Sequence, residues 1–593
     1  MSLLKQWRFV SLAIVAVLAL TALGACGDDD SGGSPTPTGG ATTAGGDDMA
    51  PADQQKLVTQ SGEPQFFDPH RSNFEQDIAI ERMLFRGLYR LVSTSSGGAE
   101  VEPAYADGEP TVSADGKVFT VKIKSGLTWS DGEPITAEQF ADGVKRGCDP
   151  AVASPYAYLL QSAAVGGIIG VKGCDEYSAA LGTADAPLTP TDAELAALRD
   201  AVGAKAIDDT TLEITLVDAK LPSTFEDVFS LWVAFPARMD VIQQFGDQWT
   251  DPANIVVNGP FTLTEYVPQD HVTLKPNANY GLDGKAKLQQ LTVKFIDDYS
   301  VAELAFKNGE LDQTRVPDTD VPTLQADSTY ADQTLVVGSA RITALEMQLT
   351  DPVLAKDKVR LALSQAIDRD KLAEVTTSNV GLPAEYWLVK GLPGYQGRDK
   401  FKTTIGYNPT AAKQALADAG YADGAGFPEL ELTVLDTPVR KAQADFLKAA
   451  FKDVLNIDIK ITAVDAKTRS AAFNSGNFQL FIGGWQLDYP DPENPIIGLF
   501  DTGGGNNKYN CSDAGIDAAI TAGSKATTLA DHIAQFQNAE DLIVTKVCGV
   551  APFLQEGLPY LVSPKMGGVQ ANGTIDAGQP GNWCAECWYV KKS

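Results

Sequence analysis

Apolar and polar side chains alternate along this chain with the period of a β-strand in some segments. In "VFTVKIK" (118–124), the apolar residues Phe119, Val121 and Ile123 fall on every second position, with polar residues between them. The segment "LTVKF" (291–295) alternates in the same way. Such a period of two is typical of a strand with one buried face. Both segments are therefore predicted to be strands.

From about residue 350 onward, helical and strand patterns follow one another in turn. The clearest helix is "YNPTAAKQALADAGY" (407–421), with Asn408 as its N-cap, Pro409 at its first position and Gly420 at its end. The same reasoning predicts helices at 358–375, 439–454, 513–525 and 529–547, and strands at 429–436, 456–464 and 477–485. Alternation of this kind predicts an α/β fold.

The N-terminal segment has the pattern of a signal peptide. Lys5 and Arg8 precede the apolar run Phe9 to Leu20, which is too short to span a bilayer comfortably. The run leads to "LGAC" (23–26), which resembles a bacterial lipobox. Residues 1–25 are therefore expected to be a lipoprotein signal peptide, with Cys26 lipidated. The alternative is ordinary secretion with cleavage at a small residue.

The next residues, 26–53, have almost no apolar side chains and are rich in Gly, Ser, Thr and Asp. Such a segment cannot bury enough apolar surface to order itself. We expect a flexible tether that joins the lipidated cysteine to a globular body outside the membrane.

Length and charge limit the classes of protein to consider. The chain has 593 residues, which is enough for two or three domains, and a formal net charge of −30. This charge argues against nucleic acids and anionic membrane surfaces as partners. Nothing in the sequence indicates an oligomer, and we expect a monomer.

Six cysteines remain when Cys26 is set aside, an even number that favours disulfides in an oxidising compartment. Cys148 with Cys174 is the preferred pair, and Cys511 with Cys548 and Cys584 with Cys587 is the least contorted remainder. Connectivity does not follow from sequence alone. The "CAEC" segment (584–587) is also compatible with a redox or zinc pair, but the three histidines are scattered and no second CxxC exists. We expect no metal site and no cofactor.

A cluster of aromatic and acidic residues, "GGWQLDYPDPEN" (483–494), follows the predicted strand 477–485. In open α/β sheets, ligands bind outside the carboxyl ends of strands. The two prolines stiffen the loop, so Trp485, Asp488 and Tyr489 are expected to be held in place. A rigid aromatic beside a carboxylate suits a ligand with an apolar body and a positive end.

Several segments together resemble one family, the extracytoplasmic solute-binding proteins of ABC importers, in the dipeptide- and oligopeptide-binding class (solute-binding protein family 5). The resemblance begins near residue 54 and covers nearly all of the chain that follows. In order, the segments are "GEPQFFDPH" (62–70), "VFTVKIKSGLTWSDGEPITAEQF" (118–140), "NGPFTLTEY" (258–266), "KPNANYG" (275–281), "FKNGELD" (306–312), "VRLALSQAIDR" (359–369), "ALADAGYADGAGFP" (415–428) and "GWQLDYPDPEN" (484–494).

This resemblance implies a two-lobed, periplasmic-binding-protein-like (type II) α/β fold with a hinged ligand cleft. Such proteins close around their ligand. The first lobe would comprise residues 54–91, 205–339 and 554–593, with an inserted subdomain at 92–204. The second lobe would comprise residues 340–553.

The resemblance also implies a function and a site. The chain would capture peptides outside the cell membrane, to which its lipid anchors it, and deliver them to an ABC permease; it would not be an enzyme. Asp488 would bind the peptide α-ammonium and Trp485 would wall the pocket. An extended segment at Asn73, Phe74 and Glu75 would bind the peptide backbone.

Some residues of these motifs have structural interpretations instead. Asp491, between two prolines, is expected to be a turn residue. Trp129 and Asp131 are expected to pack and to form a turn, before a helix that Thr136 caps. Arg369 is expected to be an internal ion-pair or helix-end residue.

Three rival functions stay open. The same shell could bind an oligosaccharide or a metal chelate, with Trp485 and Tyr489 as a stacking platform. An extracellular peptidase is disfavoured because no HExxH, GxSxG or P-loop motif occurs. A surface sensor or adhesin would use the same fold without transport.

Overall fold

The computed structural model describes residues 48–592 except 95–97, 184–185, 283, 574 and 577, and these residues belong to one compact unit. The expected signal peptide, Cys26 and residues 26–47 of the expected tether lie outside the described residues. The backbone amide of Ala50 donates to the carbonyl of Val590 (2.8 Å), and the hydroxyl of Tyr589 donates to Asp48 (3.0 Å). The chain is thus held to its C-terminal strand from Asp48, before the expected boundary at residue 54.

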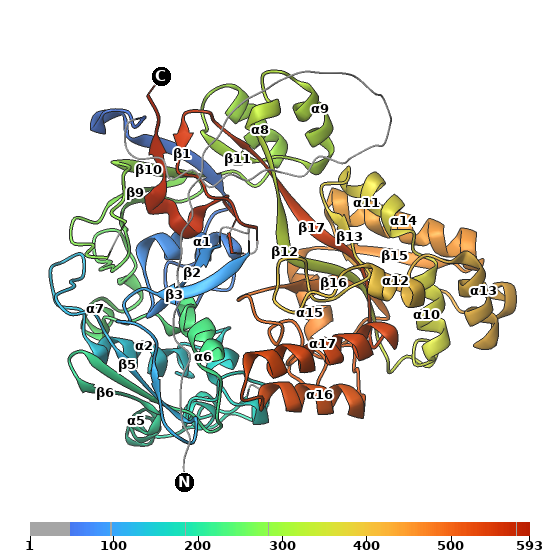
Figure 1. Cartoon of the computed structure of the whole chain (residues 1–593), viewed down its shortest axis with the longest axis horizontal. Coiled ribbons are helices and arrows are strands. Elements are labelled where there is room, and N and C mark those ends of the chain that lie inside the picture. Colours follow the sequence, from blue (N-terminus) through green and yellow to red (C-terminus); the bar gives the residue numbers. More distant parts are fainter. Residues whose placement is uncertain are drawn as a thin grey trace, which may run out of the picture. The chain divides into compact units, whose positions relative to one another are not determined.

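One mixed sheet dominates the unit (Figure 1). Its strands, in spatial order, are β15 (Ile459–Val464), β14 (Leu430–Leu435), β16 (Leu480–Gln486), β12 (Thr334–Met347), β17 (Val550–Val562), β11 (Gln313–Arg315), β1 (Lys56–Ser61), β10 (Gln290–Phe295), β9 (His271–Pro276) and β8 (Phe261–Val267), with β13 (Leu382–Pro383) paired to β17. The predicted strands at 291–295, 429–436, 456–464 and 477–485 are all present in it.

Two long antiparallel strands, β12 and β17, join the two halves of this sheet (Figure 1). At one end, β17 pairs with β11 and so with the strands formed before residue 320. At the other end, β12 pairs with β16 and so with β14 and β15. The pairing of β12 with β17 shifts register between Gly338 and Ile342. The two halves are therefore connected by backbone hydrogen bonds that change register midway.

Helices cover the half of the sheet that contains β14 to β16. They are α10 (Asp357–Gln365), α11 (Arg369–Thr377), α12 (Asp399–Ile405), α13 (Pro409–Asp418), α14 (Pro438–Leu455), α15 (Ala466–Asn474), α16 (Ala514–Ser524) and α17 (Leu529–Thr545). The side chain of Asn408 accepts from the amide of Ala411 (3.0 Å), which confirms it as the N-cap of α13.

The prediction of a single helix at 358–375 is wrong, because the structure breaks it between α10 and α11. The Asp368 carboxylate caps α11 by accepting from the amide of Lys371 (3.0 Å). The break places Arg369, which is 1% exposed, where its guanidinium donates to the carbonyls of Ala384 and Pro552. Arg369 is therefore internal, as expected, but it binds carbonyl groups of other segments rather than a carboxylate.

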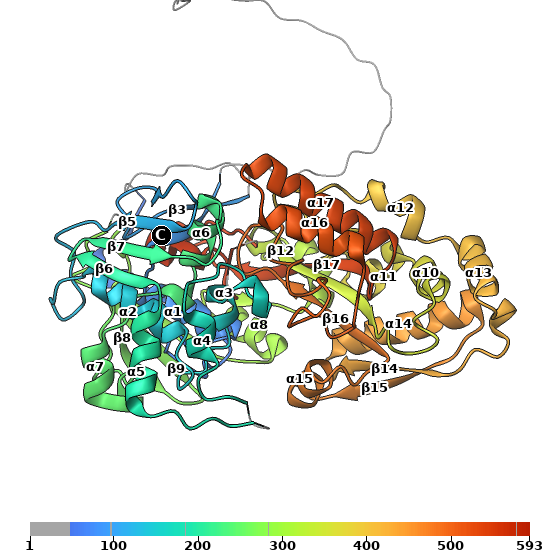
Figure 2. The ribbon, with the colours of Figure 1, turned by 90° about the horizontal axis from the view of Figure 1, so that it is seen from below.

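A separate four-stranded sheet, in the order β4 (Thr111–Val112), β5 (Val118–Lys122), β7 (Thr211–Thr215) and β6 (Ala204–Asp208), lies in the expected inserted region, and Figure 2 shows β5, β7 and β6 side by side. Trp129 is buried beside it, and its indole donates to Gln139 Oε1 (2.9 Å). The same oxygen accepts from the amide of Thr136, the N-cap of α2 (Ala137–Gly147), at 2.8 Å. These contacts confirm the structural interpretation of Trp129 and of the Thr136 cap.

The remaining elements belong to the first part of the chain and to its C-terminal tail. They are the strand pairs β2 (Tyr89–Ser93) with β3 (Ala99–Pro103) and β18 (Met566–Gly567) with β19 (Tyr589–Val590), and the helices α1 (Glu75–Leu84), α2 (Ala137–Gly147), α3 (Ala157–Leu160), α4 (Cys174–Ser178), α5 (Asp192–Ala201), α6 (Pro222–Phe229), α7 (Met239–Phe245), α8 (Tyr299–Lys307) and α9 (Val321–Ala326).

Three disulfides cross-link the described chain: Cys148–Cys174, Cys511–Cys548 and Cys584–Cys587. These are the pairs expected from the sequence. Among the residues described, no helix combines the length and the apolar character needed to cross a membrane.

Two glycines allow β16 to lie against β12. Gly484 has a φ of +133°, and a Cβ atom there would lie 1.9 Å from the carbonyl oxygen of Ile342. A Cβ atom on Gly483 would lie 2.3 Å from the carboxyl group of Glu346. Any side chain at Gly484 would push the two strands apart, so the "GG" of "GGW" is a requirement of this pairing.

We expect Gly484→Ala to lower the stability by about 3 kcal/mol or more, because the methyl group collides with backbone in a left-handed conformation. The matched control is Gly338→Ala, which lies on β12 where it pairs with β17 and where a Cβ atom meets nothing within 4 Å and φ is ordinary. Thermal unfolding of the two variants measures the difference. Equal midpoints for both variants would contradict this account.

Candidate functional site

The loop that follows β16 is fixed by one asparagine. The indole of Trp485 and the backbone amide of Asp488 both donate to Asn494 Oδ1, at 3.0 and 3.2 Å. The side-chain amide of Asn494 donates in turn to Asp488 Oδ2 (3.2 Å). The two side chains expected to contact the ligand are therefore held by the same residue, six positions beyond Asp488.

Two tyrosines from the expected inserted region approach Asp488 from the other side. The hydroxyl of Tyr156 donates to Oδ1 and that of Tyr158 donates to Oδ2, both at 3.0 Å. These residues begin α3, more than 300 positions earlier in the chain. Tyr156 also packs edge-on against Trp232, with ring centroids 4.7 Å apart. Asp488 thus lies where two distant parts of the chain meet.

The environment of Asp488 acts on its charge in two directions. Burial raises the pKa of its carboxyl group above the ordinary value, while hydrogen bonds from Asn494, Tyr156 and Tyr158 and the positive charge of Arg82 lower it. Burial and the neighbouring carboxylate raise the pKa of both tyrosines, so both hydroxyls keep their protons and act as donors. These donors solvate the carboxylate but carry no positive charge.

The other residues of the segment 483–494 differ in burial and in their hydrogen-bond partners. Trp485 is half-buried. Tyr489 is 1% exposed, and its hydroxyl donates to Glu493 Oε1 (3.2 Å), so its ring offers no free face in this arrangement. Asp491 accepts from the amide of Glu493 (2.8 Å), which confirms its expected place in a turn, but it also contacts His532.

The expected backbone-binding segment lies at the start of α1. Phe74 has an extended backbone and is 40% exposed, and its carbonyl already accepts from the amides of Asp77 and Ile78. The carboxylate of Glu75 accepts from the amide of Gly578 (2.8 Å). Glu75 lines a cavity of about 160 Å³ together with Arg315, whereas Asn73 is exposed and does not line that cavity.

A group of charged side chains comes from β12, β17 and α14. Arg341 and Arg440 both form ion pairs with Glu556, and the hydroxyl of Thr343 donates to the same oxygen (2.8 Å). Burial alone would raise the pKa of Glu556, but the charges of the two arginines outweigh it and lower the pKa to about 2. Arg341 pairs in register with Gln486, two residues before Asp488.

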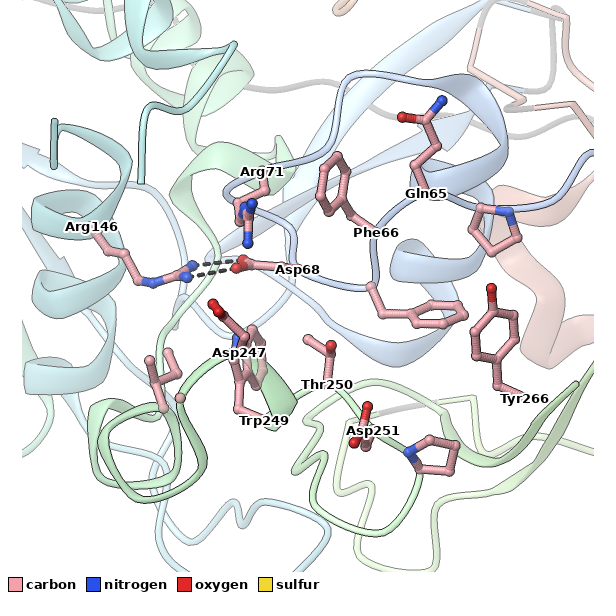
Figure 3. Close-up of a pocket in the computed structure, with 15 residues that line it drawn as sticks. Gln65, Phe66, Asp68, Arg71, Arg146, Asp247, Trp249, Thr250, Asp251 and Tyr266 are labelled. Atoms are coloured by element: carbon pink, nitrogen blue, oxygen red, sulfur yellow. Dashed lines mark hydrogen bonds and ion pairs between the residues drawn. The ribbon is translucent and has the colours of Figure 1, made fainter. Parts of the chain in front are cut away.

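Two cavities lie apart from Asp488. One of about 930 Å³ lies between the segment 162–170 and residues 497–527 and carries Lys117, Lys220 and Lys525 at its border. The other, of about 380 Å³, lies between residues 64–71 and 242–252, and Figure 3 shows the Asp68–Arg146 pair beside it. Neither cavity is lined by Trp485 or Asp488.

Sequence reasoning predicted Asp488 as a candidate ligand-binding residue but did not predict the residues that contact it in the structure. Tyr156 and Tyr158 occur in "SPYAYLL" (154–160), which carries no motif, and Arg82 lies inside an ordinary amphipathic helix. Only the alternation of two tyrosines with one spacer residue could have indicated a shared face. Their meeting with Asp488 depends on long-range contacts that no local pattern reports.

Comparison with known proteins gives a family match across the middle of the chain. The model of the "Bacterial extracellular solute-binding proteins, family 5 Middle" matches residues 100–507. This range includes the four-stranded sheet, the long strand β12 and the loop that carries Asp488.

Curated relatives cover almost the whole chain at low identity. The "Probable deoxycholate-binding periplasmic protein YgiS" of Escherichia coli is 26% identical over 87% of this chain and 90% of its own length. The "Periplasmic oligopeptide-binding protein OppA" of Escherichia coli is 27% identical over 88% of this chain and 91% of its own. Two relatives of nearly equal similarity thus carry names with different ligands.

A solved structure shows the fold. The Escherichia coli murein tripeptide binding protein MppA superposes with a TM-score of 0.72 at 24% identity, over 91% of this chain and 99% of that one. The expected two-lobed, type II periplasmic-binding-protein-like α/β class is confirmed.

We expect Glu556→Gln to lower the free energy of unfolding by about 2 kcal/mol at pH 7, because both arginines lose their charged partner. Since the pKa of Glu556 is lowered from 4.5 to about 2, its contribution is complete above pH 4.5 and is lost as the pH falls towards 2. The difference in the free energy of unfolding between variant and wild type, measured by urea denaturation, should therefore be smaller at pH 3 than at pH 7.

The control is Glu429→Gln, which changes an exposed glutamate before β14 and should leave stability unchanged at both pH values. If the difference in the free energy of unfolding between Glu556→Gln and wild type is the same at pH 7 and pH 3, the arginines do not lower the pKa of this carboxyl group.

Proposed function

The chain belongs to the bacterial extracellular solute-binding proteins of family 5, and on that premise we propose that it captures peptides outside the cell and delivers them to an ABC permease. The name of the relative OppA, with 27% identity over 88% of this chain, supports peptides as the ligand class. The solved structure of a murein tripeptide binding protein with the same fold is consistent with it. This proposal makes the chain a binding protein rather than an enzyme.

The proposed body has two lobes that close on the ligand. The first comprises residues 54–91, 205–339 and 554–593, with the subdomain 92–204 inserted, and the second comprises residues 340–553. The chain passes between them along β12 and β17, whose register shift between Gly338 and Ile342 gives these strands a local irregularity. We propose that closure bends the molecule there.

The observation that carries the proposal is the position of Asp488. This half-buried carboxylate receives hydrogen bonds from Asn494, Tyr156 and Tyr158, all of which are neutral. A peptide α-ammonium would add the positive charge that these donors do not provide. In a closed cleft, a charge-assisted hydrogen bond of this kind is strong and short. Asp488 is therefore proposed to bind the N-terminus of the peptide.

The neighbouring residues are given supporting roles. Trp485, fixed by its indole hydrogen bond to Asn494, would wall the pocket beside the ammonium group. Extended backbone at Asn73, Phe74 and Glu75 would provide hydrogen bonds to the peptide main chain, which give affinity without side-chain selectivity. Main-chain recognition of this kind suits a protein that accepts many peptide sequences.

A second candidate is a non-peptide solute in the same shell. It is favoured by the relative whose name includes deoxycholate, which is as similar to this chain as OppA is. An apolar anion would lie against Trp485 and would pair with Arg341 or Arg440 rather than with Asp488. An oligosaccharide would also use Trp485, whereas the buried Tyr489 could contribute only after a rearrangement.

The proposed location is the outer face of the cell membrane, with Cys26 as the lipidated anchor. The "LGAC" segment and the polar tether support this location. Lipidation at Cys26 would be seen as a diacylglycerol mass on the N-terminal fragment.

We expect Asp488→Asn to weaken binding of a peptide with a free N-terminus by about 2–5 kcal/mol, because one member of a desolvated charge pair is removed. The same peptide with an acetylated N-terminus should bind the wild type about as weakly. The acetylated peptide should bind wild type and variant with the same affinity, because it has no ammonium group that could pair with Asp488. Calorimetry on the full-length chain measures all four affinities.

The matched control is Asp445→Asn, a substitution on the exposed face of α14 that should leave all affinities unchanged. Peptides for the test come from mass spectrometry of what co-purifies with the protein. An Asp488→Asn variant that still prefers the free N-terminus over the acetylated one would remove Asp488 from the site. A single co-purifying non-peptide mass would favour the second candidate.

A further inference from the structure

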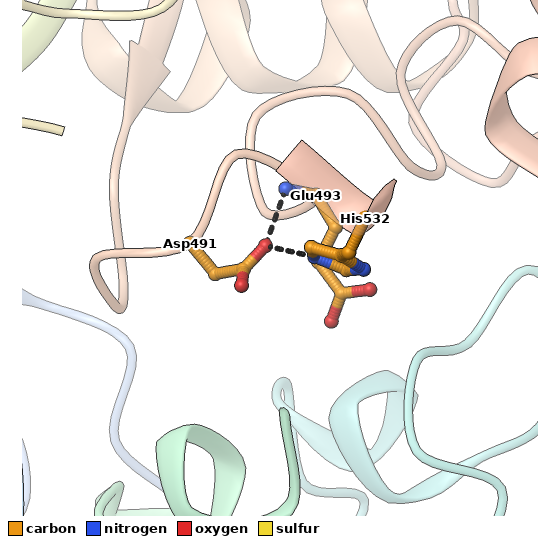
Figure 4. A group of neighbouring side chains, drawn as sticks. All are labelled: Asp491, Glu493 and His532. Carbon is orange, nitrogen blue, oxygen red and sulfur yellow. Dashed lines mark hydrogen bonds and ion pairs between the residues drawn. The ribbon is translucent and has the colours of Figure 1, made fainter. Parts of the chain in front are cut away.

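Three side chains that can bind a metal ion meet in the interior of the protein, and two of them belong to the loop after β16. Asp491 and Glu493 come from the loop after β16, and His532 comes from the first turn of α17 (Figure 4). One ligand atom from each lies within 4.8 Å of the others. All three are buried, with exposures of 3, 0 and 1%.

Both nitrogens of the His532 ring face oxygen atoms that accept hydrogen bonds. Nδ1 lies 3.1 Å from the carbonyl oxygen of Gly523, and Nε2 lies 2.8 Å from Asp491 Oδ1. An imidazole that donates its Nδ1 proton to a backbone carbonyl directs its Nε2 lone pair outward. This arrangement is the usual second-shell support of a metal-binding histidine.

Glu493 adds a second observation. Its Oε1 accepts from the hydroxyl of Tyr489 (3.2 Å), but its Oε2 is buried and has no hydrogen-bond partner. A buried carboxylate oxygen without a partner is costly. A cation bound by Glu493 Oε2 would satisfy this oxygen and would offset the charge that Asp491 places beside it.

We propose that Asp491, Glu493 and His532 bind one divalent transition-metal ion of the zinc class. Two carboxylate oxygens and one imidazole nitrogen are ligands that zinc accepts, in a set of three that leaves one further position. Two ligand atoms at about 2.0–2.1 Å from one tetrahedral ion lie about 3.3 Å apart. Nε2 and Oδ1, now 2.8 Å apart, would therefore separate by about 0.5 Å when the ion binds. The imidazole disfavours calcium and magnesium, which prefer oxygen ligands.

A further carboxylate lies near these three side chains. Asp227, on α6, is 7% exposed, and the charges of Asp491 and Glu493 act on it. Its carboxylate or a water molecule could complete the coordination. An ion at this place would also fasten the loop that carries Asp488 to α17, independently of which solute the cleft binds.

The test uses the full-length chain, stripped of metal with EDTA and then titrated with ZnCl₂, with CaCl₂ as the competing hard cation. We expect about one zinc per chain by native mass spectrometry, and no response to calcium. Glu493→Gln and His532→Gln should each weaken zinc binding by about tenfold or more. Cobalt in place of zinc should give the visible absorption of a low-coordinate site, and this absorption should disappear in His532→Gln.

The matched control is His271→Gln. His271 lies between Asp270 (3.0 Å) and Glu265 (3.3 Å), a similar set of groups that is more exposed to solvent. This variant should keep the zinc stoichiometry and the affinity of the wild type. Zinc binding that is lost in His271→Gln and kept in His532→Gln would overturn the proposal.

A further measurement is independent of whether the variants fold. The chain has three histidines, so protein labelled with ¹⁵N in its imidazole rings gives three resolvable sets of signals. Binding of ¹¹³Cd²⁺ should produce a cadmium–nitrogen coupling on one ring, that of a histidine whose other nitrogen stays protonated. No coupling and no zinc uptake would show that His532 and Asp491 form a simple buried ion pair.

Discussion

The backbone pairing of β12 with β16 is the constraint on which the candidate site depends. The pairing runs from Met347 to Arg341 on one strand and brings Gln486 level with Arg341. It is possible only because Gly484 lacks a side chain where the carbonyl of Ile342 approaches. Trp485 is then held near the end of β16, Asp488 follows it in the loop, and Arg341 lies opposite Gln486. A shift of β16 by one residue would move Trp485 to the other face of the sheet.

The loop after β16 concentrates negative charge that is half-buried at Asp488 and buried at Asp491 and Glu493. Asp488, Asp491 and Glu493 lie within six residues, and each meets a different kind of partner. Asp488 is solvated by two tyrosine hydroxyls and an amide, Asp491 meets an imidazole, and Glu493 receives one phenol. Burying carboxylates is expensive unless hydrogen bonds and opposite charges accompany them. This concentration of charge, rather than the volume of the cavities elsewhere, is the reason why the loop is proposed as the ligand site.

Local sequence patterns predicted most helices and strands but not the tertiary contacts between them. The Asn408 cap and the alternation in 118–124 and 291–295 were sufficient for the helix and the strands they mark, because capping and burial act over a few residues. The break between α10 and α11 escaped prediction, since it serves the burial of Arg369 among carbonyls from residues 384 and 552. Asp488 was found through family resemblance, whereas Tyr156 and Tyr158 lie over 300 positions away. His532 and Asp491 are 41 positions apart in the chain, so no local sequence pattern indicated that they are in contact.

The chemistry around Asp488 is the basis for the proposal that this residue binds a cationic group. A hydroxyl donates one hydrogen bond and leaves the net charge of the carboxylate unchanged, so Tyr156 and Tyr158 reduce the cost of burial without removing it. Arg82 acts on the carboxylate through its charge, but its guanidinium donates to the carbonyl of Ile575 (2.6 Å) and no hydrogen bond joins it to Asp488. An ammonium group can both donate and neutralise, and in a water-poor cleft its Coulomb energy with the carboxylate is larger than at a surface. A neutral or anionic solute would not neutralise the Asp488 carboxylate. Its affinity would have to come from contacts elsewhere, with Trp485 or with the arginines that pair with Glu556. The proposal of a ligand with a positive end therefore rests on the neutrality of the hydrogen-bond donors that surround Asp488.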